Sequence, residues 1–82
     1  MDENAIATQI VDAAFQIHSR LGPGLLETVY QSVLQYELIQ RHLSAETEVP
    51  VSINYGELKF PVGFRADIIV NKLVIVELKM PP

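Results

Sequence analysis

Residues 66–79 read Ala-Asp-Ile-Ile-Val-Asn-Lys-Leu-Val-Ile-Val-Glu-Leu-Lys, two runs of strand-forming residues on either side of the polar pair Asn71-Lys72. Such runs joined by a short polar segment are typical of a β-hairpin. We predict its second strand over Leu73–Lys79, ended by Met80-Pro81-Pro82. The centre of this strand, Val74-Ile75-Val76, is apolar enough to predict burial on both faces.

Three charged side chains stand out in this hairpin, namely Asp67, Glu77 and Lys79. Side chains two apart on a strand share a face, so we expect Glu77 and Lys79 to point the same way and Leu78 to point into a core. A carboxylate among such apolar neighbours costs free energy unless it is paired or bound to a metal. Asp67 and Glu77 on adjacent strands would form a hard-oxygen site suited to Mg²⁺. Lys79 could then orient a water or stabilise charge on a phosphate, as a metal-dependent phosphodiester hydrolase requires.

This site depends on the register of the hairpin, because only residues on one face of a sheet can converge. A two-residue turn at Asn71-Lys72 would place Asp67 and Glu77 on opposite faces. A three-residue turn over Asn71–Leu73, or a bulge, would restore a common face. The metal-site interpretation therefore predicts an irregular turn at this point.

Two helices are expected before the sheet. Apolar residues recur with helical spacing over Asp2–His18, with Asp2 or Asn4 as the N-cap and Gly22-Pro23 as the stop signal. A second helix is predicted from Gly24 or Leu25 to about Arg41. The short connection predicts an angled or antiparallel pair of helices.

Two further strands are expected between these helices and Leu73–Lys79. Residues Val49–Ile53 alternate as a strand, and Pro50 suggests a sheet edge or a strand start. Tyr55-Gly56-Glu57 is a turn signal, and a second extended stretch follows over Leu58–Val70. The predicted fold class is α+β: one domain over residues 1–82, with two N-terminal helices packed on one face of a three-stranded antiparallel meander, ααβββ.

A second group of polar residues opens the second helix, in Gly24-Leu25-Leu26-Glu27-Thr28-Val29-Tyr30. Glu27 and Tyr30 are three apart and therefore adjacent on a helix surface. Glu27 could supply a third acidic group, and Tyr30 could hold it or fill core space. The alternatives are a Glu27 that only interacts with the helix dipole, and a Glu77–Lys79 pair that is exposed and contributes under about 1 kcal/mol.

Composition limits the function classes. The chain has 82 residues, of which 49% are hydrophobic, and it contains no cysteine, which excludes disulfides and thiol chemistry and is consistent with a cytoplasmic location. No apolar run is long enough to span a membrane. The net charge of −4, with only six basic residues, disfavours strong nucleic-acid binding by this chain alone. His18 and His42 lie far apart in the sequence, so a metal role for them is not favoured.

Taken in order, these motifs resemble a known family. Leu21-Gly22-Pro23, Gly24-x-x-Glu27-x-x-Tyr30, Phe64-Arg65-Ala66-Asp67 and Val76-Glu77-Leu78-Lys79 look like the GxxExxY proteins of the PD-(D/E)XK nuclease superfamily. The resemblance implies a restriction-endonuclease-like αβββαβ core and Mg²⁺-dependent (or Mn²⁺-dependent) cleavage of nucleic acid. It also implies that Asp67 and Glu77 bind the metal and that Lys79 and Glu27 are catalytic.

The sequence departs from this family in one respect. Members continue after the Glu-x-Lys strand with a helix and another strand, whereas this sequence stops at Pro82, so we expect a partial core. The uncovered third strand or sheet face predicts a homo-oligomer, most simply a dimer. The alternative to a nuclease-like enzyme is a non-catalytic interaction or remnant domain that retains the fold.

Overall fold

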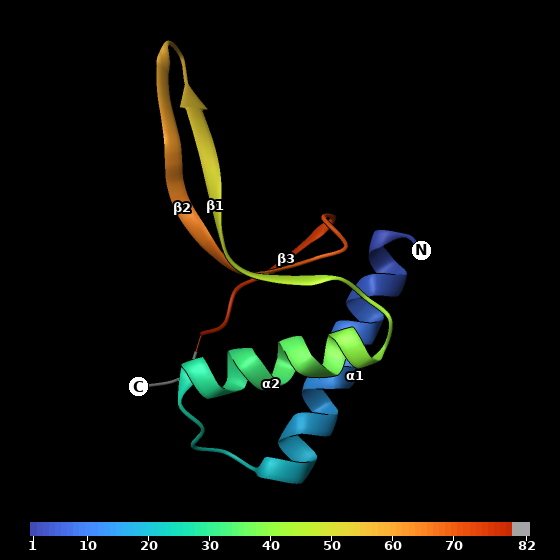
Figure 1. Cartoon of the computed structure of the whole chain (residues 1–82). Helices are drawn as coiled ribbons and strands as arrows, with labels where there is room; N and C mark the ends of the chain where they lie inside the picture. The colour runs from blue at the N-terminus through green and yellow to red at the C-terminus, as the bar shows by residue number, and fades with distance from the viewer. Residues whose placement is uncertain (80–82) are drawn as a thin grey trace.

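The computed structural model describes residues 1–79 (Figure 1). Two helices precede three strands, as predicted, and the chain has the expected α+β class. The elements are, in order, α1 Glu3–Leu21, α2 Glu27–Gln40, β1 Ala45–Tyr55, β2 Leu58–Val70 and β3 Val74–Val76.

Both predicted helices form, with shifted boundaries. The Asp2 carboxylate accepts a hydrogen bond from the backbone N–H of Ala5 at 2.8 Å, which confirms Asp2 as the N-cap of α1. Helix α1 continues past His18 to Leu21 and ends at the predicted stop signal, where Gly22 takes a φ of 71°. Helix α2 begins only at Glu27, later than predicted, because Gly24 has a left-handed φ of 92° and the N-cap Leu26 has an extended backbone with a ψ of 146°.

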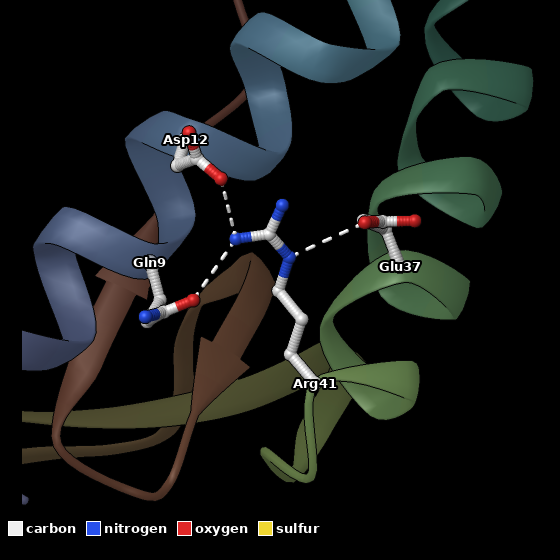
Figure 2. Close-up of polar contacts among 4 residues, drawn as sticks. All are labelled: Gln9, Asp12, Glu37 and Arg41. Atoms are coloured by element: carbon white, nitrogen blue, oxygen red, sulfur yellow. Dashed lines mark hydrogen bonds and ion pairs between the residues drawn. The ribbon is translucent and has the colours of Figure 1, made fainter.

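The two helices cross at an angle (Figure 1) and are joined by the side chain of Arg41, which follows α2. Its guanidinium donates to the Asp12 carboxylate at 2.8 Å and to the Gln9 side-chain oxygen at 2.9 Å, both on α1, and to Glu37 on α2 at 3.2 Å (Figure 2). The Asp12 hydrogen bond is the main factor that raises the pKa of Arg41. This network fixes α1 against the C-terminal end of α2.

The sheet is an antiparallel meander in the order β1-β2-β3. β1 begins at Ala45, earlier than the predicted Val49, and is an edge strand as Pro50 suggested. The helices cover only the part of the sheet near the β2–β3 turn, and the long β1–β2 hairpin projects away from them (Figure 1). The core lies between the helices and this covered part; its largest fully buried side chains are Ile6, Leu34, Leu38, Ile68 and Val70.

The third strand differs from the prediction. β3 spans only Val74–Val76, not Leu73–Lys79, and Ile75 is 49% exposed, so the predicted burial on both faces is wrong. The physical reason is that the helices pack on one sheet face only, where Val74, Val76 and Leu78 contact the core as expected. The predicted stop at Met80-Pro81-Pro82 lies outside the described residues.

Candidate functional site

The turn between β2 and β3 sets the register of the candidate site. It contains three residues, Asn71–Leu73, and it pairs Val70 with Val74 and Ile68 with Val76. This confirms the irregular turn that a common face requires. Asn71 and Lys72 take left-handed φ values of 50° and 56°, and the Asn71 side chain accepts a hydrogen bond from the Ser44 N–H at 2.8 Å, so the turn is anchored to the segment before β1.

The same register brings Asp67 opposite Glu77, one position beyond the last paired residues. Asp67 alternates with the buried Ala66 and Ile68 and is half-buried, so its side chain leaves β2 on the face opposite the core. Its carboxylate accepts a hydrogen bond from the backbone N–H of Leu78 at 2.7 Å. The carboxylate of Asp67 is therefore held against the backbone that carries Glu77.

The Glu77 side chain is exposed, so the high cost expected of a carboxylate in this apolar stretch does not arise. Partial desolvation nevertheless raises the pKa of Glu77 above its ordinary value, and the negative charge of Asp67 and a hydrogen bond with the Asp67 side chain raise it further. A backbone hydrogen bond from Asp67 and, to a smaller extent, the positive charge of the nearby Lys79 oppose this shift. The two carboxyl groups are thus close enough to interact, and a cation between them would relieve their repulsion.

A pocket of about 380 Å³ joins the end of the sheet to the start of α2. It brings the Gly24-to-Tyr30 motif to the Glu-x-Lys motif, two segments that are about 50 residues apart in the sequence. Its lining residues are His18, Pro23, Gly24, Tyr30, Glu77, Leu78 and Lys79. Glu77 and Lys79 therefore lie on one concave surface.

The structure does not bring Glu27 into this group. Glu27 is the first residue of α2 and is exposed. Within residues 1–79, no three side chains of the His, Cys, Asp and Glu types lie together as a metal-binding group. Tyr30 is buried in the core, as its packing interpretation predicted, and burial raises the pKa of its hydroxyl.

Sequence reasoning missed two residues that contact this region. The ring of His18 lies 5.9 Å from the ring of Tyr30 and lines the pocket. Gln31 donates its side-chain N–H to the backbone oxygen of Asp67 at 2.8 Å and to the Glu48 carboxylate at 3.0 Å. The position of His18 one turn before the Gly22-Pro23 stop could have indicated its place at the helix end, whereas no sequence signal predicts the Gln31 contact.

Gln31 replaces a missing contact in the sheet. Glu48 faces Asp67 in the β1–β2 register but is not paired with it, and it has a φ of 52°. Because the strand ladder is interrupted there, the Gln31 amide satisfies the Asp67 carbonyl instead. Helix α2 is thereby bonded to β2 at Asp67, whose carboxylate is a candidate metal ligand.

Comparison with known proteins identifies one family. A family model described as the PD-(D/E)XK nuclease superfamily matches residues 4–81. No curated protein matches the chain, and no solved structure does. Neither helix of the described chain is long and apolar enough to cross a membrane.

Proposed function

The chain belongs to the PD-(D/E)XK nuclease superfamily, and from this membership we propose that it is a metal-dependent nuclease-like domain of the GxxExxY type. The reaction is the hydrolysis of a phosphodiester bond in nucleic acid. The observation that carries the proposal is the facing arrangement of Asp67 and Glu77, which follows from the three-residue turn at Asn71–Leu73.

The donor set fits a hard divalent cation. Two carboxylates offer the oxygen ligands that Mg²⁺ and Mn²⁺ prefer, and the raised pKa of Glu77 reflects in part its interaction with Asp67. Asp67 and Glu77 would hold the ion. When bound, such an ion supplies positive charge that stabilises a phosphate and makes a water more acidic.

The other residues of the site have distinct roles in this proposal. Lys79 presents an ammonium beside Glu77 on the pocket wall, where it stabilises the negative charge that develops on the phosphate. Gln31 is a positioning residue, since it holds the backbone of Asp67. Glu27 has no contact with these residues. Its proposed role is therefore limited to contacting the substrate at the N-terminus of α2.

The charge of the chain bears on the substrate. With ten acidic and six basic residues, the chain lacks the excess of positive charge that drives tight binding to a nucleic-acid backbone. The proposal therefore includes weak, salt-sensitive substrate binding that depends on the metal ion. The lack of cysteine supports a reducing compartment such as the cytoplasm.

Calorimetric titration with Mn²⁺ tests the metal site directly. Titration of the natural chain should give a binding heat that fits a single Mn²⁺ site. Asp67→Ala and Glu77→Ala should each abolish this binding heat. Glu57→Ala is the matched control, because Glu57 is an exposed acid in the β1–β2 turn. Equal heats in all four proteins would exclude the site and leave a non-catalytic domain.

Catalysis is tested separately. Supercoiled plasmid and single-stranded DNA and RNA are incubated with the chain in Mg²⁺, in Mn²⁺ and in excess chelator. The proposal requires metal-dependent cleavage that Lys79→Ala removes while Mn²⁺ still binds. Cleavage that persists in chelator would contradict the proposed chemistry.

A further inference from the structure

The β1–β2 hairpin carries an uncovered apolar face. Near the helices, odd-numbered residues of β1 and their partners on β2 face the core, from Ala45 paired with Val70 to Val49 paired with Ala66. The same alternation continues outward along β1, past a bulge in β2 between the Val51–Phe64 and Ile53–Phe60 pairs. Six side chains extend this face beyond the helices: Val51, Ile53, Tyr55, Leu58, Phe60 and Phe64.

Five of these six side chains are exposed. Their exposed fractions range from 40% at Ile53 to 78% at Tyr55. The opposite face of the hairpin is mostly polar and carries Ser52, Asn54, Lys59 and Arg65, with Pro50 as an apolar member. An antiparallel sheet with one apolar and one polar face normally buries the apolar one, and a two-stranded hairpin alone is at best marginally stable in water.

The shape of the chain indicates how much surface remains to be buried. Its accessible surface is 5992 Å², whereas a compact monomer of 9.2 kDa exposes about 4,900 Å². Its radius of gyration is 14.1 Å, against about 12 Å for a compact domain of this length. The excess of about 1,100 Å² is comparable to the roughly 800 Å² that each partner buries in a standard interface.

We propose that the apolar face of this hairpin is a dimer interface, covered by the same face of a second copy of the chain. The face contains no charged side chain within its six residues, so it offers nothing to select a charged partner such as nucleic acid. It is self-complementary by composition, which suits the two-fold packing of identical surfaces. Two such hairpins would stack as a small sandwich with their polar faces in water.

This interface differs from the one expected from the sequence, which placed association at the third strand or the uncovered sheet face. β3 is only three residues long, and Val74 and Val76 already contact the core. The larger exposed apolar area lies on the hairpin. The inference does not depend on the proposed nuclease activity, because Asp67 and Glu77 lie outside the six residues of this face.

Analytical ultracentrifugation of the full chain up to about 1 mM tests the proposal. We expect a monomer–dimer equilibrium. Phe60→Glu should raise the dissociation constant at least about tenfold, because association would bury a charge. Asn54→Glu, with the same charge on the polar face, should leave it unchanged. A chain that stays monomeric, or a dimer that Phe60→Glu does not weaken, overturns the proposal.

A second measurement does not depend on the folding of the charged variant. The chain has no cysteine, so single cysteines at Leu58 and Lys59 report on opposite faces of one strand. The labelling rate of the Leu58→Cys thiol should fall as protein concentration rises, and that of Lys59→Cys should not. Equal concentration dependence of the labelling rate at both positions contradicts the proposal. A chain that stays monomeric, and whose Leu58→Cys thiol is protected only when lipid vesicles are added, contradicts it as well.

Discussion

Asp67 on β2 and Glu77, the residue directly after β3, face each other because the turn that joins the two strands contains three residues. Val70 is paired with Val74. Asp67 lies three residues before Val70 and Glu77 three residues after Val74, so the two acids come to lie opposite each other. Asp67 is further tied to the β3 side by its 2.7 Å hydrogen bond from the Leu78 N–H. A turn shorter by one residue would send one carboxylate to the other face.

The turn itself should be sensitive to backbone conformation. Asn71→Ala places an alanine at a left-handed φ of 50°, where its side chain can make no local hydrogen bond. The substitution also removes the hydrogen bond from the Ser44 N–H. We expect a loss of about 2–3 kcal/mol in the free energy of unfolding, measured by urea denaturation. Asn71→Gly retains the backbone conformation and should lose only about 1 kcal/mol. Equal losses would show that the φ angle is not the source of the effect.

The contact between Gln31 and Asp67 should link helix α2 to the proposed metal site. Gln31→Leu leaves the Asp67 carbonyl without its side-chain donor and should destabilise the chain by about 1–3 kcal/mol. It should also weaken Mn²⁺ binding, because the backbone at Asp67 is then free to shift.

Gln35→Leu is the matched control for this prediction. Gln35 makes the same kind of bond, at 2.9 Å, to the backbone oxygen of Ala45, which is away from the acids. It should give a similar loss of stability by urea denaturation with no change in Mn²⁺ affinity. Similar Mn²⁺ affinities for both variants would remove the positioning role of Gln31.

The pKa of Glu77 should fall when its neighbour loses its charge. In Asp67→Asn the repulsion from the Asp67 carboxylate is absent, so the pKa of Glu77 moves down towards its ordinary value. Carbon-detected NMR titration of the Glu77 carboxyl measures this shift. Glu57→Gln, at the far end of the hairpin, should leave the Glu77 titration unchanged; an unchanged titration in Asp67→Asn would mean that the carboxyl groups do not interact.

The raised pKa of Glu77 also predicts how stability depends on pH without metal. In the folded state Glu77 keeps its carboxyl proton to a higher pH than in the unfolded state. Its contribution to stability is therefore present below pH 4.5 and is lost as the pH rises through the folded-state pKa. Glu77→Gln should abolish this decline in urea midpoints. Added Mn²⁺ should counteract it in the natural chain, because the ion binds the ionised acid.

The Arg41 network should stabilise the helix pair. Arg41→Ala removes contacts to Asp12, Gln9 and Glu37 and should lower the free energy of unfolding by about 1–2 kcal/mol, a value reduced by the solvent exposure of Asp12. Thermal unfolding in low and high salt measures the effect, which should shrink in high salt. Arg20→Ala, at an exposed arginine of α1, should change stability by less than about 0.5 kcal/mol. Equal effects of the two substitutions would contradict the importance of the network.

Much of the fold was predictable because its signals are local. The Asp2 cap, the left-handed Gly22 and the turn after Tyr55 depend on residues within a few positions of one another. The boundaries of β2, Leu58–Val70, agree with the prediction for the same reason. The burial of β3 on one face was not predictable, because apolar Val74-Ile75-Val76 fits a fully buried strand as well as a strand covered on one face.

The amino-acid order alone specified the two helices, the meander and the pair of acids at 67 and 77, since each follows from side-chain type and short-range spacing. Folding in three dimensions determined the rest. It selected the three-residue turn over the two-residue one, left Glu27 outside the acidic pair, and brought His18 and Gln31 to the site. These outcomes depend on how strands and helices pack at long range, and a change of one residue in register reverses the face of every side chain that follows.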